Sequence, residues 1–296
     1  GRGRCDPDVL RQAGRPLAAG VMPEETDLYG LIGHPVEHSR SPLIHRLFAE
    51  QIGQLIDYVL IDAAPGSFDE TVAAFRERGG RGLNVTLPYK GNSFRICTHP
   101  TLRATQARAV NTLAWTPAQL IGDNTDGAGL VADLRENLGV ELQNRRLLLV
   151  GAGGAARGAV GPLLEAKPAE LVIANRTADR AVSLAQAFAP DGPVRAEVFE
   201  DLEPSFDLVI NATSASLSGH VPDLPSAIVG PTTFCYDMMY GRHPTAFLKW
   251  ATAMGAAGCA DGIGMLVEQA AESFLLWRHV RPDTAPVLEK IRQSLS

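Results

Sequence analysis

The fold of this chain is decided by the segment Leu147-Leu148-Leu149-Val150-Gly151-Ala152-Gly153-Gly154-Ala155-Ala156-Arg157. Four apolar residues in a row suit a strand buried on both faces of a parallel sheet, and the glycines fit G-x-G-x-x-G/A. Gly151 permits a tight turn, Gly153 lets the backbone approach a pyrophosphate, and Ala156 lets the next helix pack closely. Free N–H groups at the helix start would face the anion. The alternative is a glycine-rich turn of the kind that precedes any helix.

A second strand is expected after the glycine turn. The crossover helix ends near Lys167-Pro168, and the apolar run 171–174 follows it. An enzyme that uses NAD usually places an acidic residue at the end of this strand, where it holds the ribose 2′-hydroxyl. Here the chain has Asn175-Arg176-Thr177, 24 residues beyond Gly151.

The charges at this point favour a phosphorylated ribose. Thr177 suits the N-cap of a helix through Ala189, which places Arg176 and Arg180 around a helix N-terminus. Cations there oppose the helix dipole by about 0.3–1 kcal/mol each, so an anion is needed nearby. A 2′-phosphate supplies one, and the predicted cofactor is NADP. The alternative is that Asp179 and solvent satisfy both arginines.

Composition bounds the class of protein. A length of 296 residues suggests two domains, and 45% hydrophobic with 20% charged residues is ordinary for a globular protein. The net charge of −6 provides no basic field for nucleic acid or a membrane surface. No apolar run approaches the roughly 18 residues of a membrane span, so neither nucleic acid nor membrane is an expected partner.

Cysteines and histidines show no metal or redox spacing. The four cysteines, Cys5, Cys97, Cys235 and Cys259, are far apart, which favours reduced thiols in the cytoplasm. His34, His38 and His45 lack an accompanying cysteine or carboxylate cluster, so no metal site is expected. Residues 1–26 contain four arginines and no apolar core of a signal peptide, and they are interpreted as an N-terminal extension for which disorder is expected.

Strand and helix patterns alternate along the chain. Ser41 is the expected N-cap of a helix with Pro42 at its first position, and a helix is expected from Asp126. The turn 116–118 predicts a hairpin. The expected strands are 28–33, 58–61, 82–87, 109–113, 119–122, 194–199, 208–210 and 234–237, and the last long helix begins near residue 264.

Uncharged polar residues with one lysine and one aspartate stand where strands end or helices begin, positions that commonly face clefts. Taken singly, the serines are explained as caps, the asparagines as turn residues and the lysine as a solvated charge. The set is Ser39, Ser41, Asn84, Thr86, Lys90, Asn111 and Asp126.

In these motifs the chain resembles the shikimate dehydrogenase (shikimate/quinate dehydrogenase) family. The order and spacing match from residue 27 to the end of the chain. The motifs are Ser39-Arg40-Ser41-Pro42, Asn84-Val85-Thr86-x-Pro88-x-Lys90, Ala109-Val110-Asn111-Thr112, Gly122-Asp123-Asn124-Thr125-Asp126-Gly127, the glycine turn, Asn175-Arg176-Thr177, Asn211-Ala212-Thr213-Ser214, Tyr236-Asp237-Met238-x-Tyr240 and Asp261-Gly262-x-Gly264-Met265-Leu266-Val267-x-Gln269. One departure is Arg108, where the family commonly has glycine, and another is Met239, where an aromatic residue is frequent.

The resemblance implies an α/β fold with two domains. An N-terminal α/β substrate domain spans 27–125, a doubly wound Rossmann-type NADP domain spans 126–265, and the C-terminal helical segment 266–296 returns to the substrate domain. It implies reversible, NADP-dependent reduction of 3-dehydroshikimate to shikimate in aromatic biosynthesis. The alternatives are a quinate/shikimate dehydrogenase and a non-catalytic NADP-sensing protein. A monomer or homodimer is expected.

The resemblance also implies roles for individual residues. Lys90 is the expected catalytic lysine, paired with Asp126; an ammonium can donate the proton and stabilise the charge that forms on a reduced carbonyl oxygen. The expected substrate contacts are Ser39, Ser41, Asn84, Thr86, Asn111, Asp126, Tyr240 and Gln269. The expected cofactor contacts are Gly151, Ala152, Gly153, Gly154, Ala155, Asn175, Arg176, Thr177, Arg180, Thr213, Met238 and Gly262.

Overall fold

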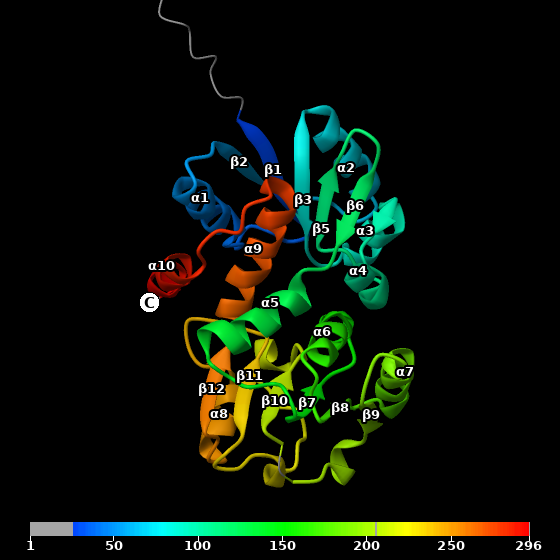
Figure 1. Ribbon diagram of the computed structural model, residues 1–296, viewed down its shortest axis with the longest axis vertical. Coiled ribbons are helices and arrows are strands. Elements are labelled where there is room, and N and C mark those ends of the chain that lie inside the picture. The colour runs from blue at the N-terminus through cyan, green and yellow to red at the C-terminus, as the bar shows by residue number, and fades with distance from the viewer. Residues whose placement is uncertain (1–25, 205, 296) are drawn as a thin grey trace, which may run out of the picture.

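Two six-stranded sheets with helices around them form the molecule (Figure 1). The structure is a computed structural model that describes residues 26–204 and 206–295. The expected extension 1–26 therefore lies outside the described residues, apart from its last position. In Figure 1 the first sheet occupies the upper half of the molecule and the second sheet the lower half.

The first sheet has the order β2-β1-β3-β5-β6-β4. Its strands are β1 (Asp27–Gly33), β2 (Ile56–Asp62), β3 (Gly80–Val85), β4 (His99–Pro100), β5 (Thr112–Trp115) and β6 (Leu120–Asp123). Strands β1, β2 and β3 are parallel, whereas β5 is antiparallel to both β3 and β6. The expected hairpin is confirmed, and the amide of Thr116 donates to the carbonyl of Gln119 at 2.9 Å. The helices of this half are α1 (Ser41–Gln51), α2 (Phe68–Glu77), α3 (Lys90–Ile96) and α4 (Leu102–Ala107).

The second sheet is fully parallel in the order β12-β11-β10-β7-β8-β9. Counted along the chain, this is the 3-2-1-4-5-6 order of a Rossmann fold, which confirms the predicted fold class. Its strands are β7 (Arg146–Val150), β8 (Glu170–Ala174), β9 (Val194–Glu197), β10 (Leu208–Asn211), β11 (Phe234–Asp237) and β12 (Gly258–Asp261). Its helices are α6 (Gly154–Glu165), α7 (Ala178–Phe188) and α8 (Ala246–Ala253).

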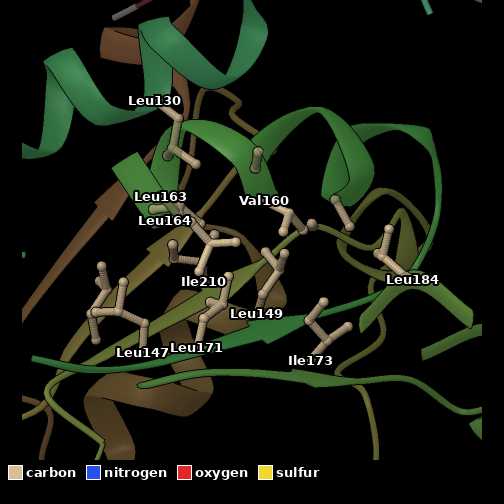
Figure 2. Packing of buried hydrophobic residues seen from close by; sticks show 14 of the residues in the cluster. Leu130, Leu147, Leu149, Val160, Leu163, Leu164, Leu171, Ile173, Leu184 and Ile210 are labelled. Carbon is tan, nitrogen blue, oxygen red and sulfur yellow. The ribbon is translucent and has the colours of Figure 1, made fainter. Parts of the chain in front are cut away.

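Burial on both faces explains the apolar run of β7. Leu147 and Leu149 belong to the cluster beneath α6, whereas Leu148 and Val150 belong to the cluster on the opposite face; all four are fully buried. Figure 2 shows the first of these clusters, in which Val160 and Leu163 of α6 point toward the strands. The expected close packing of Ala156 is also observed, since its side chain has no exposed area.

Helix α5 (Asp126–Ala132) lies between the two sheets, and helix α9 (Ile263–Arg278) runs from that level along the first sheet (Figure 1). They approach so closely at Gly129 that an added Cβ would lie 2.6 Å from the amide nitrogen of Gln269. A π-helical turn, Asp133–Asn137, continues α5. Helix α9 and the last helix, α10 (Ala285–Leu295), pack in one cluster with Ile44 and Phe48 of α1, so the chain returns to the first sheet.

Two expected capping interactions are absent from the described residues. Helix α1 begins at Ser41 itself, and Arg40 occupies the N-cap position without a side-chain cap bond. Thr177 does stand at the N-cap of α7, but its hydroxyl makes no cap bond. The hydroxyls of Ser41 and Thr177 therefore do not cap these helices.

Candidate active site

Lys90 and Asp126 form an ion pair between the two halves of the molecule. Lys90 is the first residue of α3 and Asp126 the first residue of α5, and the ammonium donates to Oδ2 of the carboxylate at 2.6 Å. Both side chains are partly buried. The carboxylate suits the N-terminus of α5, whereas the lysine opposes the dipole of α3 and gains from the neighbouring carboxylate. The structure thus brings together the two residues expected to be catalytic.

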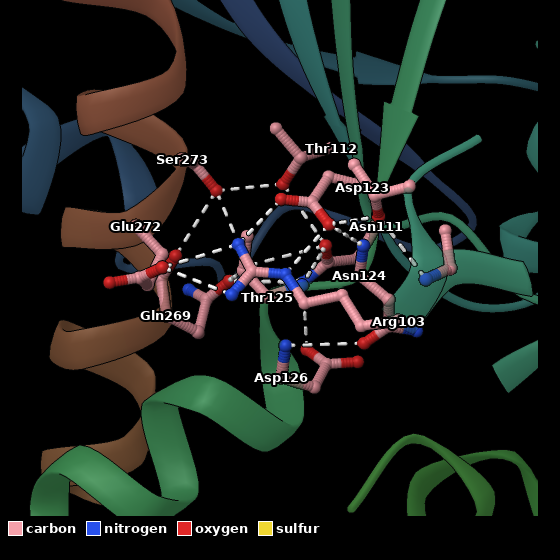
Figure 3. A network of polar contacts seen from close by, with 12 residues as sticks. Arg103, Asn111, Thr112, Asp123, Asn124, Thr125, Asp126, Gln269, Glu272 and Ser273 are labelled. Atoms are coloured by element: carbon pink, nitrogen blue, oxygen red, sulfur yellow. Dashed lines mark hydrogen bonds and ion pairs between the residues drawn. The ribbon is translucent and has the colours of Figure 1, made fainter. Parts of the chain in front are cut away.

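Asn111 connects this pair to helix α9. Its Nδ2 donates to Oδ1 of Asp126 at 2.9 Å and to Oε1 of Gln269 at 3.3 Å, and its Oδ1 accepts from the amide of Thr125 at 2.9 Å. Gln269 in turn donates to the carbonyl of Leu266. Figure 3 shows these side chains converging from the β5–β6 hairpin, the start of α5 and α9. Each of these side chains is therefore oriented by polar neighbours.

An adjacent ion pair holds the end of the hairpin. Arg103 donates from Nε and Nη2 to the two oxygens of Asp123, at 2.7 and 2.5 Å, and also contacts Glu272 of α9. Burial raises the pKa of Asp123, but the Arg103 guanidinium outweighs this and leaves the pKa lower than usual. Asp123 directly precedes the segment Asn124-Thr125-Asp126. The Arg103–Asp123 ion pair therefore holds the backbone that leads to Asp126 (Figure 3).

The expected carboxylate-binding serines lie together. Ser39 donates from its hydroxyl to Ser41 at 3.2 Å, and the amide of Ser41 donates to Ser39 Oγ. Thr86 lies at the end of β3 beside Gly33, where an added Cβ would come within 2.4 Å of the threonine methyl group. Tyr240 is buried in large part against the α1 and α9 cluster, and its pKa is raised by burial. Among the described residues, no hydrogen bond joins Tyr240 to the serines.

Asn84 is buried behind these residues. Its Oδ1 accepts from His45 Nε2 at 3.1 Å and from the Tyr58 hydroxyl at 2.8 Å. Its Nδ2 has Asn111, Thr112 and Ser273 as acceptors, at 2.9 to 3.3 Å. Every hydrogen-bonding position of the amide is thus occupied by protein.

The glycine turn fits a dinucleotide phosphate. Gly151 has a φ of +114°, a conformation that a side chain would strain, and its amide donates to the carbonyl of Ala174. A Cβ added at Gly153 or Gly154 would meet nothing within 4 Å, so open space lies over the start of α6. The first N–H groups of a helix have no intrahelical partner and bind anions.

An open pocket of about 470 Å³ lies over this turn. It is lined by Ala152, Gly153, Gly154, Arg157, Asp179, Arg180, Ser183 and Leu184. Arg180 thus reaches the pocket as expected, whereas Arg176 is exposed beside it and does not line it. Neither arginine forms an ion pair with Asp179 or any other described residue. Asn175 donates to the carbonyl of Thr177 and so shapes the loop.

The sequence interpretation did not include Arg157 and Ser183 of the pocket. Arg157 ends the glycine-containing segment but lies one turn into α6, and Ser183 lies in α7, so neither is one of the loop positions that the prediction assigned to the cofactor. Arg157 donates from Nε to the carbonyl of Gln106 in α4, across the two halves of the molecule. Burial, and next the charge of Arg108, lower its pKa.

The remaining expected cofactor residues lie at the carboxyl edge of the second sheet. Thr213 follows β10 and packs against Gly151, where an added Cβ would lie 3.1 Å from the threonine methyl group. Met238 follows β11, and its carbonyl oxygen would lie 2.2 Å from a Cβ at Gly262. Ala155 packs partly against the core below α6. In open α/β sheets this edge is where ligands bind.

The three histidines do not gather at one place. His34 pairs with Asp62 at 2.5 Å on the surface, and His45 is buried in α1. Across residues 26–204 and 206–295 no group of three or more His, Cys, Asp or Glu side chains could hold a metal ion. Cys97, Cys235 and Cys259 are free thiols, and Cys5 lies outside the described residues. In the same part of the chain, no helix has the length and apolar character to cross a membrane.

Comparisons with known proteins agree with this geometry. Residues 31–113 match the model of the shikimate dehydrogenase substrate binding domain, 133–218 that of shikimate / quinate 5-dehydrogenase, and 262–292 that of the shikimate 5′-dehydrogenase C-terminal domain. A shikimate dehydrogenase (NADP(+)) of Nitrosospira multiformis is 56% identical over 271 residues, 91% of this chain and 98% of that protein. The chain belongs to the shikimate dehydrogenase family.

Solved structures share the fold of this chain. An Ael1 enzyme from Pseudomonas putida superposes with a TM-score of 0.86 at 45% identity, covering 90% of this chain and 98% of that one. The shikimate 5-dehydrogenase of Thermus thermophilus, in complex with NADP(H) and shikimate, has a TM-score of 0.81 at 31% identity, covering 92% and 100%. The shikimate dehydrogenase fold therefore spans both sheets of this chain.

Proposed function

We propose that this chain is an NADP-dependent shikimate dehydrogenase. The reaction is the reversible reduction of 3-dehydroshikimate to shikimate in the biosynthesis of chorismate and the aromatic amino acids. The observation that carries the proposal is the Lys90–Asp126 pair at 2.6 Å, surrounded by neutral hydrogen-bonding side chains between the two sheets. Membership of the family, and relatives that carry this activity in their names, support it.

The neutral polar side chains match a polyhydroxylated ring. Each substrate hydroxyl needs a partner when it leaves water, and a site that supplies partners rejects analogues that lack the hydroxyl. We assign Asn111, Asp126, Gln269 and Thr86 to the ring hydroxyls. The hydroxyls of Ser39 and Ser41, with Tyr240, are assigned to the carboxylate and its surroundings. Asn84 is not assigned to the substrate, because its amide makes all its hydrogen bonds to protein.

Lys90 and Asp126 are assigned the proton chemistry. NADPH, when bound, supplies the hydride that reaches the carbonyl carbon of the substrate. The Lys90 ammonium stabilises the negative charge that develops on the carbonyl oxygen and donates a proton to it. In the reverse direction the neutral amine accepts the proton of the same hydroxyl. Asp126 orients Lys90 and accepts from a neighbouring substrate hydroxyl.

The cofactor is assigned to the pocket over the glycine turn. The backbone from Gly151 to Ala155 would hold the pyrophosphate, because open space and free N–H groups meet there. The 2′-phosphate is assigned to Asn175, Arg176, Thr177 and Arg180; both arginines are available for an anion. Thr213, Met238 and Gly262 would border the nicotinamide, since they lie at the same sheet edge.

We propose 27–125 and 126–265 as the two domains, with 266–296 returning to the first.

A turnover assay separates this proposal from a protein that only senses NADP. We expect reduced cofactor to form when shikimate and NADP are both present, and none when either is omitted. Binding of NADP without turnover would favour the sensor and contradict the proposal. We further expect the enzyme to be cytoplasmic. We also expect a monomer or a homodimer, and light scattering of the purified chain tests this oligomeric state.

A further inference from the structure

His45 is enclosed by aromatic side chains behind the serine pair. Its ring is fully buried and stacks on Tyr58 with ring centres 4.4 Å apart and planes inclined by 10°. Trp277, Phe48 and Phe274 surround the remaining sides at 5.2 to 6.2 Å. The rings come from α1, β2 and α9, so this cluster joins the first sheet to the C-terminal helices.

An imidazole in this place carries a cost that a phenyl ring would avoid. Nδ1 is buried and has no hydrogen-bond partner, and an unsatisfied buried polar atom is unfavourable. Burial lowers the pKa of His45 to about 3, against a smaller opposing effect of its hydrogen bond to Asn84, so the ring is neutral at physiological pH. The other ring nitrogen, Nε2, forms the hydrogen bond of this side chain, to Asn84.

Nε2 fixes the orientation of the Asn84 amide. Because Nδ1 has no hydrogen-bond partner, the tautomer that fits the contacts carries its proton on Nε2 and donates to Asn84 Oδ1. The Tyr58 hydroxyl donates to the same oxygen. Two donors on one oxygen prevent the amide from flipping, and Nδ2 is therefore directed toward Asn111, Thr112 and Ser273.

From Asn84 the network reaches the proposed substrate site in two directions. Thr112 donates to Oδ1 of Asn111, the residue whose Nδ2 contacts Asp126. On the other side, the Tyr58 hydroxyl interacts with the Ser41 side chain, an interaction that opposes the rise of the Tyr58 pKa caused by burial. Asn84 thus lies between the two groups of side chains assigned to the ring hydroxyls and the carboxylate.

We propose that His45 is a positioning residue for the substrate: its Nε2–H locks Asn84, and Asn84 holds Asn111 and the Tyr58–Ser41 pair in their binding orientations. Asn84 itself is then a positioning residue and not a substrate contact. This inference rests on the proposed function, because the ligand whose affinity it concerns is the polyhydroxylated carboxylate of the reaction. It predicts that the loss of one donor far from the reacting atoms weakens substrate binding selectively.

Two substitutions separate the donor from the ring. His45→Phe keeps an aromatic ring and removes the donor, whereas His45→Gln removes the ring and keeps an amide donor near the position of Nε2. For His45→Phe we expect KM for shikimate to rise about tenfold, the effect of one hydrogen bond, with Tm close to wild type and KM for NADP unchanged. For His45→Gln we expect a lower Tm and a KM for shikimate within about threefold of wild type.

The opposite pattern overturns the proposal. An unchanged KM in His45→Phe, or a KM that follows Tm in both variants, would make His45 only part of the core. Tyr58→Phe removes the second donor to Asn84 and serves where His45→Phe does not fold; it too must raise KM for shikimate. If the wild type does not oxidise shikimate, the proposed function fails. The positioning role of His45 can still be tested by ¹⁵N NMR of its ring. A proton on Nδ1, or titration of the ring near neutral pH, would contradict that role.

Discussion

Lys90 is the first residue of α3, where the helix dipole disfavours a positive charge, and Asp126 of α5 stabilises that charge. Because the ammonium lies 2.6 Å from Asp126, it is held where neutral side chains of the hairpin and α9 converge. We propose that the ammonium, held at this point by Asp126, faces the substrate oxygen on which negative charge develops. These two side chains therefore account for the proposed proton chemistry.

Substitution of Lys90 tests that assignment. Lys90→Ala should lower kcat by about 10²–10⁴-fold, the usual contribution of general acid–base catalysis, and leave the affinity for NADP unchanged. The exposed Lys249 offers a control, since Lys249→Ala removes a lysine far from the pair. A near-normal kcat with a raised KM for shikimate would make Lys90 a binding residue and Asp126 the better candidate for proton transfer.

We assign the preference for NADP to Arg176 and Arg180. Both are exposed at the start of α7 without an ion-pair partner among the described residues. Replacing both with alanine should weaken NADP binding at least about tenfold, because each charge-assisted hydrogen bond contributes roughly 1.5–3 kcal/mol. NAD binding should change little. Titration calorimetry with the two cofactors measures this, with Arg76→Ala as the control; an equal loss for both cofactors would refute the assignment.

At the scale of elements, the second sheet is the more predictable part. Strands β7 and β8 are buried on both faces, so their sequences are uninterrupted apolar runs that can be recognised directly. Strand β4 has two residues and β12 reads Gly-Cys-Ala-Asp, so neither has an apolar run. Both form because neighbouring strands offer them hydrogen bonds, which a local pattern does not reveal.

The site follows the same division. Lys90, Asp126 and the glycine turn stand in local motifs and were predicted from the sequence. The His45–Asn84–Ser273 connection was not, because its members are separated by 39 and 189 positions. Ser273 and His45 each look like an ordinary helical residue in the sequence. Only the packing of α1 and α9 against β3 brings them together.

The end of α4 supplies a prediction about stability. Arg108 is its C-cap and has a φ of +50°, a left-handed conformation that favours glycine. Arg108→Gly should stabilise the fold by about 1 kcal/mol, measured by chemical denaturation. Arg78 is the matched control: it is the C-cap of α2 with a φ of −78°, and Arg78→Gly should destabilise. A loss of stability in both variants would contradict this explanation.

At the scale of the whole molecule, the proposed substrate residues and the cofactor pocket belong to different sheets. Hydride transfer requires the substrate carbon and the nicotinamide to approach, and the contacts of α5 with α9 and of Arg157 with α4 are where the halves meet. We expect the two halves to close when both ligands bind. Small-angle scattering, or crystal structures with and without NADP and shikimate, measures the change; an identical interdomain angle in every state would contradict it.

The central claim is that this molecule acts on shikimate with NADP. The most direct test is the rate of the purified chain with shikimate or quinate, each combined with NADP or NAD. We predict the highest kcat/KM for shikimate with NADP, a large loss when NAD replaces NADP, and weak turnover of quinate. Equal kcat/KM for NADP and NAD, or for quinate and shikimate, would contradict the account.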